Sequence, residues 1–295
     1  MVELFAFLIV LFALLIGSYT DIKVREVPDW LSFFLIAAGF GIGIIKSVID
    51  LSFSPLISSS IGFGIAFGIS LLMFYTGQWG GGDAKILMGV GAVIGVTFDF
   101  QNIIPSLLTN FFLSFIFNTI IVGAFYGLLW GIGLGIVNRK KLFLEIEQIF
   151  FSEKIKKLRY FTAIACAILV IVIFSLPFRA VRFSLITLVL IIFSTLYLWI
   201  YVKAVEKVCM VKKVTPSELT EGDWIIEDII INKKFIAGKK DLGVSKEQIK
   251  ELTSFFKEGK IKHVTIKTGI PFIPSFLISL LITYFAGNIF LLFVH

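Results

Sequence analysis

Gly80-Gly81-Gly82-Asp83-Ala84-Lys85 separates two long apolar segments, residues 56–77 and 86–96. An ionised aspartate beside lipid is energetically costly, so such a residue usually faces the protein interior or marks a functional site. The three glycines have no side chains, so another backbone can approach the aspartate closely. A second aspartate, Asp21, stands in a matching place at the end of the first apolar segment. We therefore predict that Asp21 and Asp83 form one catalytic pair.

The composition is that of a membrane protein. Of the 295 residues, 58% are hydrophobic and only 16% are charged. Several runs reach the roughly 20 apolar residues that cross a bilayer. We expect an all-α polytopic membrane protein of about eight transmembrane helices, with a small cytoplasmic α+β domain before the last helix. The expected spans cover approximately residues 4–20, 30–49, 55–77, 84–98, 107–137, 160–177, 183–203 and 271–293.

The basic residues are distributed unevenly between the two sides of the membrane. When the loops are assigned to alternate sides, 24 of the 27 lysines and arginines fall on one side. This excess predicts that the basic side is cytoplasmic and that both termini are extracytoplasmic. The net charge of +7 then reflects orientation in a cell membrane, and we expect no nucleic-acid partner. Asp21 and Asp83 both fall at the cytoplasmic boundary.

The segment before the last span has the composition of a soluble protein. Residues 224–231 have the pattern of a strand, and Ser245-Lys246-Glu247-Gln248 predicts a capping box that opens a helix. Residues 138–159 are too charged to span, and we expect them to lie on the cytoplasmic leaflet beside anionic lipid. The expected domains are a transmembrane core, a cytoplasmic domain and a C-terminal transmembrane helix, over residues 1–203, 204–268 and 269–295.

Each aspartate also has a simpler explanation. Asp21 could be a solvated loop residue paired with a nearby cation, and Asp83 could cap the fourth span. Asp29, which follows Pro28, is predicted to be the N-cap of the second span, and this leaves Asp21 without such a role. Capping and catalysis are compatible, because a cap holds the carboxylate in place.

Spans two to five contain small and polar residues at helical spacing. Glycines four residues apart predict seams where helices approach closely, and they are Gly64, Gly68, Gly91, Gly95, Gly123, Gly127 and Gly131. Asn110, Ser114 and Asn118 form a polar stripe on one face of the fifth span. We expect this stripe to make interhelical hydrogen bonds. Orientation of a substrate or of a catalytic carboxylate is its alternative role.

Paired carboxylates suit peptide hydrolysis. Two carboxyl groups in one site cannot both ionise cheaply, so one keeps its proton. The ionised group then activates a water molecule for attack on the peptide carbonyl, and the protonated group protonates the leaving nitrogen. The sequence does not assign these two roles, because the groups titrate as a pair. The two cysteines and two histidines form no ligand cluster, so we expect no metal and no cofactor.

Two motifs carry a resemblance to a known family: Asp21 with Lys23 and Val27-Pro28, and Gly80-Gly81-Gly82-Asp83 with Lys85. In both, the sequence resembles the type IV prepilin peptidases, which are membrane aspartyl proteases with a G-x-G-D motif. It most resembles their archaeal branch, the preflagellin (prearchaellin) peptidases. The similarity covers both motifs and a C-terminal region from Glu221 to Pro274. The resemblance implies that Asp21 and Asp83 are catalytic. We assign a substrate-binding or site-shaping role to Gly80, Gly81, Gly82, Lys85, Lys23, Pro28, Pro271, Phe272 and Pro274.

The resemblance also implies a substrate and a cleavage position. The partners would be prepilin or preflagellin (archaellin) precursors with class III signal peptides, cut just before the hydrophobic segment. Their basic n-region stays cytoplasmic, which places the scissile bond at the depth of the two aspartates. Many bacterial relatives carry cysteine pairs that are associated with methylation of the product. This chain has none, so we expect proteolysis without methyl transfer.

Three other functions stay open. A presenilin-like or signal-peptide-peptidase-like protease also pairs aspartates, although its first aspartate typically follows a tyrosine, and here Thr20 precedes Asp21. A transporter or channel would use carboxylates near the bilayer midplane, but Asp50 and Asp99 fall in outer loops. A purely structural membrane anchor would tolerate neutralisation of both aspartates.

Overall fold

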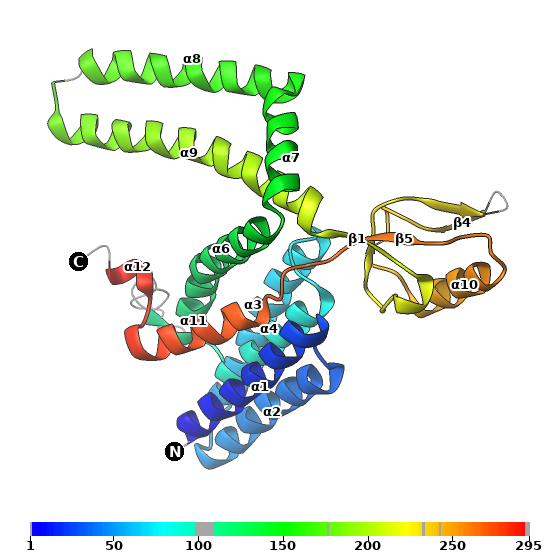
Figure 1. Cartoon of the computed structure of the whole chain (residues 1–295). Coiled ribbons are helices and arrows are strands. Elements are labelled where there is room, and N and C mark those ends of the chain that lie inside the picture. The colour runs from blue at the N-terminus through cyan, green and yellow to red at the C-terminus, as the bar shows by residue number, and fades with distance from the viewer. Residues whose placement is uncertain (1, 98–108, 176, 232–233, 242, 293–295) are drawn as a thin grey trace. The chain divides into compact units, whose positions relative to one another are not determined.

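A computed structural model describes residues 2–97, 109–175, 177–231, 234–241 and 243–292 (Figure 1). The helices are α1 (Val2–Val24), α2 (Asp29–Ile49), α3 (Ser54–Tyr75), α4 (Gly81–Ile94), α6 (Phe111–Val137), α7 (Arg139–Phe151), α8 (Glu153–Ser175), α9 (Arg179–Cys209), α10 (Lys246–Lys257), α11 (Ile273–Ala286) and α12 (Ile289–Leu292). The strands are β1 (Val211–Val214), β2 (Trp224–Ile225), β3 (Ile229–Ile231), β4 (Lys234–Ala237) and β5 (Val264–Lys267), and a 3-10 turn, η1, covers Pro216–Glu218.

The helices are those of a polytopic membrane protein. Among the described residues, six helices are long and apolar enough to cross a membrane, namely α1, α2, α3, α6, α8 and α9. The predicted fourth and last spans correspond to α4 and α11, which have 14 residues each. The total of about eight transmembrane helices therefore stays a prediction. Residue 98 of the predicted fourth span and residues 107–108 of the predicted fifth span lie outside the described residues.

The described chain falls into two compact units. The first comprises Met1–Gly127, Thr215–Val264 and Gly269–His295, and the second comprises Leu128–Val214 and Thr265–Thr268. The predicted domain boundaries near residues 203 and 268 remain a prediction. Both aspartates belong to the first unit.

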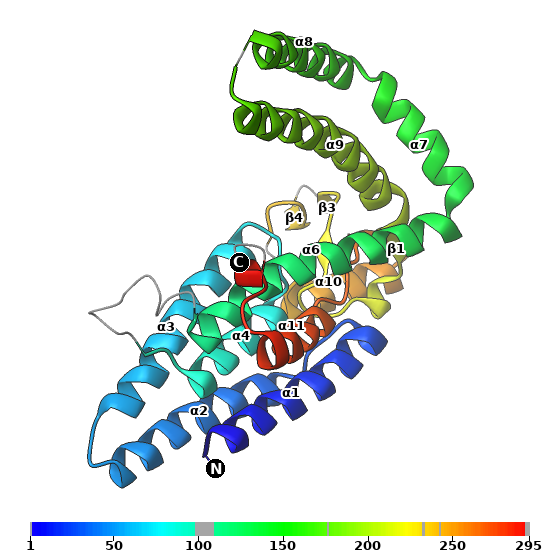
Figure 2. The same ribbon diagram turned by 90° about the vertical axis from the view of Figure 1, so that its left-hand side faces the viewer.

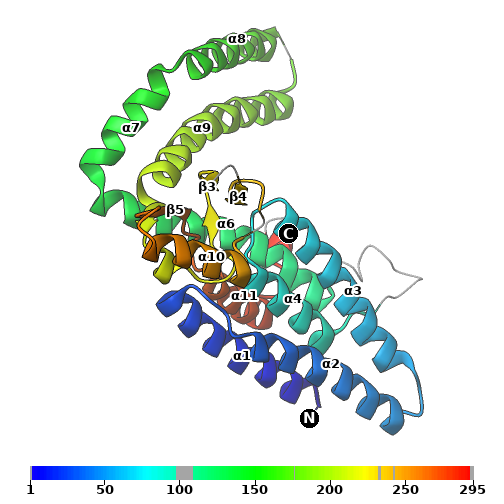
Figure 3. The same cartoon turned by 90° about the vertical axis from the view of Figure 1, so that its right-hand side faces the viewer.

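In the first unit, α4 is the central helix and packs against α2 and α3, while α11 packs along α1 (Figure 3). Gly91 of α4 meets the Gly62 carbonyl of α3, where an added Cβ would lie only 2.5 Å from the oxygen. This close approach confirms a glycine seam at Gly91. The predicted seam at Gly64 and Gly68 is wrong, because an added Cβ at either position meets no described atom within 4 Å. The buried face of α3 carries Ser59, Gly62, Ala66 and Ser70 instead, and the spacing of Gly64 and Gly68 alone could not say which face turns inward.

The polar stripe of α6 makes hydrogen bonds between and within helices. The buried Asn118 amide donates to Thr283 Oγ1 (2.9 Å) and to the Gly287 carbonyl (2.8 Å), and its oxygen accepts the Ile289 N–H (3.0 Å). These bonds satisfy backbone groups where α11 ends and α12 begins. Asn110 accepts two backbone N–H bonds at the start of α6. The prediction of interhelical hydrogen bonds is therefore confirmed at Asn118.

In the first unit, the segment Thr215–Val264 contains the helix and the strands expected of the small α+β domain. The capping box is confirmed, since Ser245 Oγ accepts the Gln248 N–H (3.3 Å) and Gln248 Oε1 accepts the Ser245 N–H (2.8 Å). Strands β3 and β4 form an antiparallel hairpin. The single strand predicted over residues 224–231 is wrong, because it is broken into β2 and β3. Asp228 lies between these two strands, and its Oδ1 accepts the Lys239 N–H (3.0 Å).

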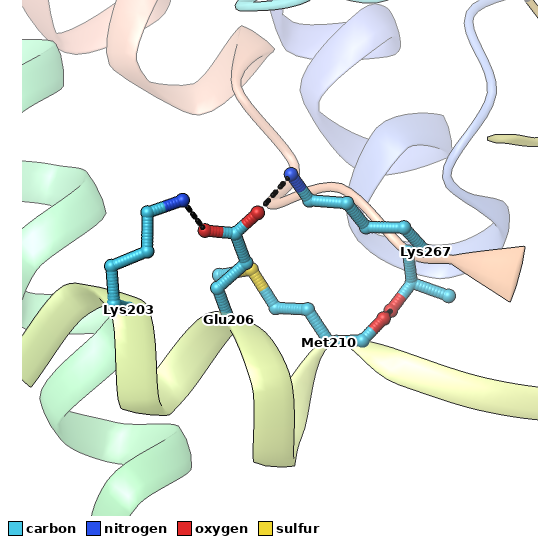
Figure 4. A network of polar contacts seen from close by, with 5 residues as sticks. Lys203, Glu206, Met210 and Lys267 are labelled. Carbon is cyan, nitrogen blue, oxygen red and sulfur yellow. Dashed lines mark hydrogen bonds and ion pairs between the residues drawn. The ribbon is translucent and has the colours of Figure 1, made fainter. Parts of the chain in front are cut away.

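In the second unit, α8 and α9 run side by side, and α7 packs against α9 (Figures 1 and 2). The predicted interfacial stretch 138–159 forms α7 and the first turns of α8. Few apolar residues of α8 and α9 are buried within the structure, as expected of helices that face lipid. Glu206 of α9 pairs with Lys203 (2.9 Å) and Lys267 (2.7 Å) beside the neighbouring strands β1 and β5 (Figure 4).

Candidate active site

Asp21 is a buried residue in the last turn of α1, with 6% of its surface exposed. Its Oδ2 accepts the backbone N–H of Ile273, the first residue of α11, at 3.0 Å. The first N–H groups of a helix have no partner within the helix and attract negative charge. The start of α11 therefore holds the Asp21 carboxylate. The alternative that Asp21 is a solvated loop residue is wrong.

Asp83 lies in the first turn of α4, outside the six long apolar helices. The N-cap of α4 is Gly80, and Asp83 is the third residue of the helix. Its Oδ2 accepts the Gly80 N–H at 3.1 Å. Asp83 thus caps α4 from the N3 position rather than as the N-cap residue. This bond fixes one carboxylate oxygen.

The two carboxyl groups interact with each other. Desolvation by the surrounding protein and the nearby Asp21 charge raise the pKa of Asp83 from 3.8 to about 7, against the opposing effect of the Gly80 N–H bond. Two neighbouring carboxylates cannot both ionise cheaply, so this pair can share one proton near neutral pH. Tyr126 of α6 is also within electrostatic reach of Asp21. Sequence reasoning missed this tyrosine, which carried no motif signal.

An aromatic cluster connects the elements that hold the two aspartates. Trp79 directly precedes the glycine stretch, and its ring centroid lies 5.6 Å from that of Phe272 and 5.3 Å from that of Phe276. Phe272 is the N-cap residue of α11 and lies against Gly123 of α6, which has no side chain in its way. The cluster therefore packs the start of α4 against the start of α11.

The three glycines before Asp83 have different surroundings. A Cβ added at Gly82 would lie 3.0 Å from Val27 Cβ, so this glycine lets the second motif pack on the loop of the first. A Cβ at Gly81 would touch only Phe74 at 3.8 Å, and one at Gly80 only Asp83 Oδ2 at 3.5 Å. Gly80 and Gly81 therefore leave room beside the Asp83 carboxylate.

The comparisons with known proteins match this part of the chain. Residues 8–128 match the type IV leader peptidase family, over a range that contains both aspartates and the glycine stretch. This match, which covers only the N-terminal part of the chain, confirms the resemblance seen in the sequence motifs.

Several similar proteins are named preflagellin peptidase. Those of Methanococcus voltae and Methanococcus maripaludis are 44% and 41% identical over 89 and 81 residues, which cover 30% and 28% of this chain. That of Methanocaldococcus jannaschii is 35% identical over 88 residues, or 30% of this chain. The matched segments span only 35–38% of these relatives' lengths.

The two lysines predicted to shape the candidate site, Lys85 and Lys23, are at least partly exposed. Lys85 forms an ion pair with Asp29 at 2.6 Å and is partly exposed. The prediction that Asp29 is the N-cap of α2 is wrong, because Pro28 is the N-cap and Asp29 makes no capping bond. Its carboxylate turns to the Lys85 ammonium instead. Lys23 lies over the Tyr19 ring, 5.5 Å from the centroid.

The prolines predicted near the site start two helices. Pro28 precedes α2, and Pro274 is the second residue of α11. Pro271 is buried beside Phe272 in the segment that leads into α11. Proline lacks an N–H and suits the first turn of a helix. Ile273, which lies between Pro271 and Pro274, supplies the N–H that Asp21 accepts. This helix start lies outside residues 8–128, the range that the family model matches.

Sequence reasoning missed two further contacts near the candidate site. Arg25 adopts a positive φ of 61° at the end of α1, and its guanidinium donates to the Gly269 carbonyl. Trp224 of β2 lies against Gly77. Gly77 follows the C-terminal end of α3, just before the glycine stretch, and has a positive φ of 70°. A Cβ at Gly77 would lie 2.8 Å from Trp224 Cζ3. Neither contact has a sequence signal, because each joins residues far apart in the chain.

Proposed function

We propose that this chain is a membrane-embedded aspartic endopeptidase that cleaves class III signal peptides of the prepilin or preflagellin type. The observation that carries the proposal is the interacting pair of Asp21 and Asp83, each held by a backbone N–H at the start of a helix. The family match and the names of the relatives support a peptidase that acts on such precursors.

In the proposed mechanism the two aspartates share one proton. Asp83, with a pKa of about 7, holds it near neutral pH, while Asp21 is ionised and accepts the Ile273 N–H. Asp21 takes a proton from water, and that water attacks the scissile carbonyl. Asp83 hydrogen-bonds the carbonyl oxygen and then protonates the leaving nitrogen. The room beside Gly80 and Gly81 would receive the unwound substrate backbone.

The proposed site lies at the cytoplasmic face of the cell membrane, with both termini outside. Asp21 ends α1, whereas Asp83 begins α4. If α1, α2 and α3 cross the membrane in alternating directions, these two ends lie on the same side. The excess of basic residues on that side supports the proposal that it is cytoplasmic. A signal peptide with a basic n-region would present its scissile bond there, just before its hydrophobic segment.

Cleavage of three substrates by purified protein in liposomes tests the proposal. The first is a prepilin-type precursor, the second is the same precursor with its n-region lysines and arginines replaced by glutamine, and the third is an unrelated single transmembrane helix. We expect the first to be cut once, just before the hydrophobic segment, as read by mass spectrometry. The second should be cut more slowly, because its n-region no longer favours the cytoplasmic side, and the third should stay intact. Cleavage of the third within its membrane segment would favour a presenilin-like protease. Cleavage of none would contradict the proposed peptidase.

A further inference from the structure

The position of the Asp21 carboxylate depends on where α11 begins. Its Oδ2 accepts the Ile273 N–H at 3.0 Å across a separation of 252 residues in the chain. The residues just before α11, 268–272, form neither helix nor strand. A segment without secondary structure has no internal bonds that fix its path. Contacts of its side chains and carbonyls must therefore set the point at which α11 starts.

This segment is also where the chain passes from one compact unit to the other. Thr268 belongs to the second unit, and Gly269 belongs to the first. On the side of the second unit, Thr268 is fixed to α9, because its N–H and hydroxyl both donate to the Met210 carbonyl, at 2.8 and 3.1 Å. Lys267 is fixed to Glu206 of the same helix (Figure 4). On the side of the first unit, Phe272 packs against Trp79, and Arg25 binds the backbone of the segment.

Arg25 donates from its guanidinium to the Gly269 carbonyl, four residues before Ile273. Its own backbone N–H donates to the Asp21 carbonyl at 3.0 Å, so its position is tied to the last turn of α1. The guanidinium also interacts electrostatically with Asp21. One residue thus connects the end of α1, which carries Asp21, with the segment that leads to the N–H group that Asp21 accepts.

The backbone of Arg25 indicates that its side chain is needed there. Its φ of 61° lies in the left-handed region, which glycine adopts without cost at the end of a helix and other residues rarely adopt. Arg25 and Leu51 are the non-glycine residues with positive φ in the described part of the chain. A strained conformation that persists beside a candidate site points from the structure to a role for the residue.

We propose that Arg25 is a positioning residue for Asp21. By binding the Gly269 carbonyl, Arg25 fixes the start of α11 and keeps the Ile273 N–H directed at the Asp21 carboxylate. The planar guanidinium suits this task because its donors are held in a rigid fork, whereas a lysine ammonium is a point charge on a flexible stem. The proposal deepens the proposed peptidase activity and rests on it for its kinetic consequence.

The test compares Arg25→Gly with Arg25→Lys and with a matched control, Arg182→Gly. Glycine relieves the left-handed backbone, so Arg25→Gly folds at least as well as wild type and isolates the loss of the side chain. The control arginine also donates to a backbone carbonyl, that of Pro177, but it lies in the second unit. Each variant is measured for kcat and KM on the prepilin-type precursor, for its unfolding midpoint, and for hydrogen exchange of the peptide covering residues 269–276.

For Arg25→Gly we expect an unchanged KM and a kcat lower by about 10- to 100-fold, as for a carboxylate displaced by a fraction of an ångström. Exchange of the 269–276 peptide becomes faster, and Arg25→Lys recovers part of the kcat. Arg182→Gly keeps the wild-type kcat and exchange, although glycine within α9 lowers its unfolding midpoint. An unchanged kcat or an unchanged exchange rate in Arg25→Gly would overturn the proposal. If wild type cleaves no precursor, the peptidase fails, and hydrogen exchange alone decides whether Arg25 fixes the start of α11.

Discussion

Replacement of Asp83 by asparagine is expected to stabilise the protein above neutral pH. The pKa of Asp83 is about 7, against 3.8 for a free aspartate. Between these pH values the folded state binds more protons than the unfolded state, so the free energy of unfolding falls as the pH rises through this window. Asparagine does not titrate, so the free energy of unfolding of Asp83→Asn lacks this decline with pH. The stabilising effect of Asp83→Asn should therefore be absent near pH 4 and complete above about pH 7.

The size of the effect follows from the pKa difference. Each pKa unit corresponds to about 1.36 kcal/mol, so a difference of roughly 3 units gives up to about 4 kcal/mol. The asparagine oxygen can still accept the Gly80 N–H that Asp83 accepts now, so the start of α4 is kept. Asp83→Ala removes both the charge and this acceptor, and it should be less stable than Asp83→Asn by about 1 kcal/mol at every pH.

Unfolding midpoints in a nonionic detergent measure this prediction. Wild type, Asp83→Asn and Asp83→Ala are unfolded by heat at several pH values between about 4 and about 8, and only the differences from wild type are compared. A stabilising difference that grows with pH for both variants supports the account. A difference that is constant with pH, or an Asp83→Asn variant that is less stable than wild type at high pH, would contradict the desolvation of Asp83 beside Asp21.

Four more predictions concern the same site and its surroundings. The rate of precursor cleavage should fall as the pH rises above about 7, because Asp83 then loses the proton that it donates, and a rate that keeps rising in a pH–rate profile would contradict this. Gly77→Ala should lower the free energy of unfolding by about 1–2 kcal/mol, since φ is positive there and the new methyl group meets Trp224. Gly81→Ala should leave the unfolding midpoint unchanged and reduce cleavage, because its methyl group fits the fold but fills the room proposed for substrate, so equal cleavage would count against that placement. Asn118→Ala should destabilise by about 2–3 kcal/mol without changing the cleavage position, as read from denaturant titration and mass spectrometry.

The sequence predicted the helices well because their apolar runs are long and their ends are marked by charge, proline or glycine. It also located two aspartates at helix ends, where an ionisable residue in a membrane protein needs an explanation. The capping box at Ser245 was predictable for a related reason, since it involves residues three apart. Local patterns of this kind depend on neighbours in the chain.

The predictions that were wrong, and the contacts that were missed, depend on residues that are far apart in the chain. Asp29 satisfies every local rule for an N-cap, yet Lys85 of another helix takes its carboxylate. Gly64 has the spacing of a packing seam but lies on the wrong face of α3. The N–H of Ile273 donates to Asp21, which is 252 residues away in the sequence. No pattern in either segment predicts that contact. The positive φ of Arg25 was equally hidden, because arginine is not a residue that signals a left-handed turn.

The most direct test of the central claim is precursor cleavage by wild type, Asp21→Asn and Asp83→Asn, reconstituted at equal amounts. Asparagine keeps the shape of the side chain and its backbone hydrogen bond but removes the ionisable group. The account predicts that wild type cuts once before the hydrophobic segment and that each single variant, folded and inserted normally, is slower by more than about 100-fold. Cleavage by either variant at the wild-type rate would contradict the paired-aspartate mechanism.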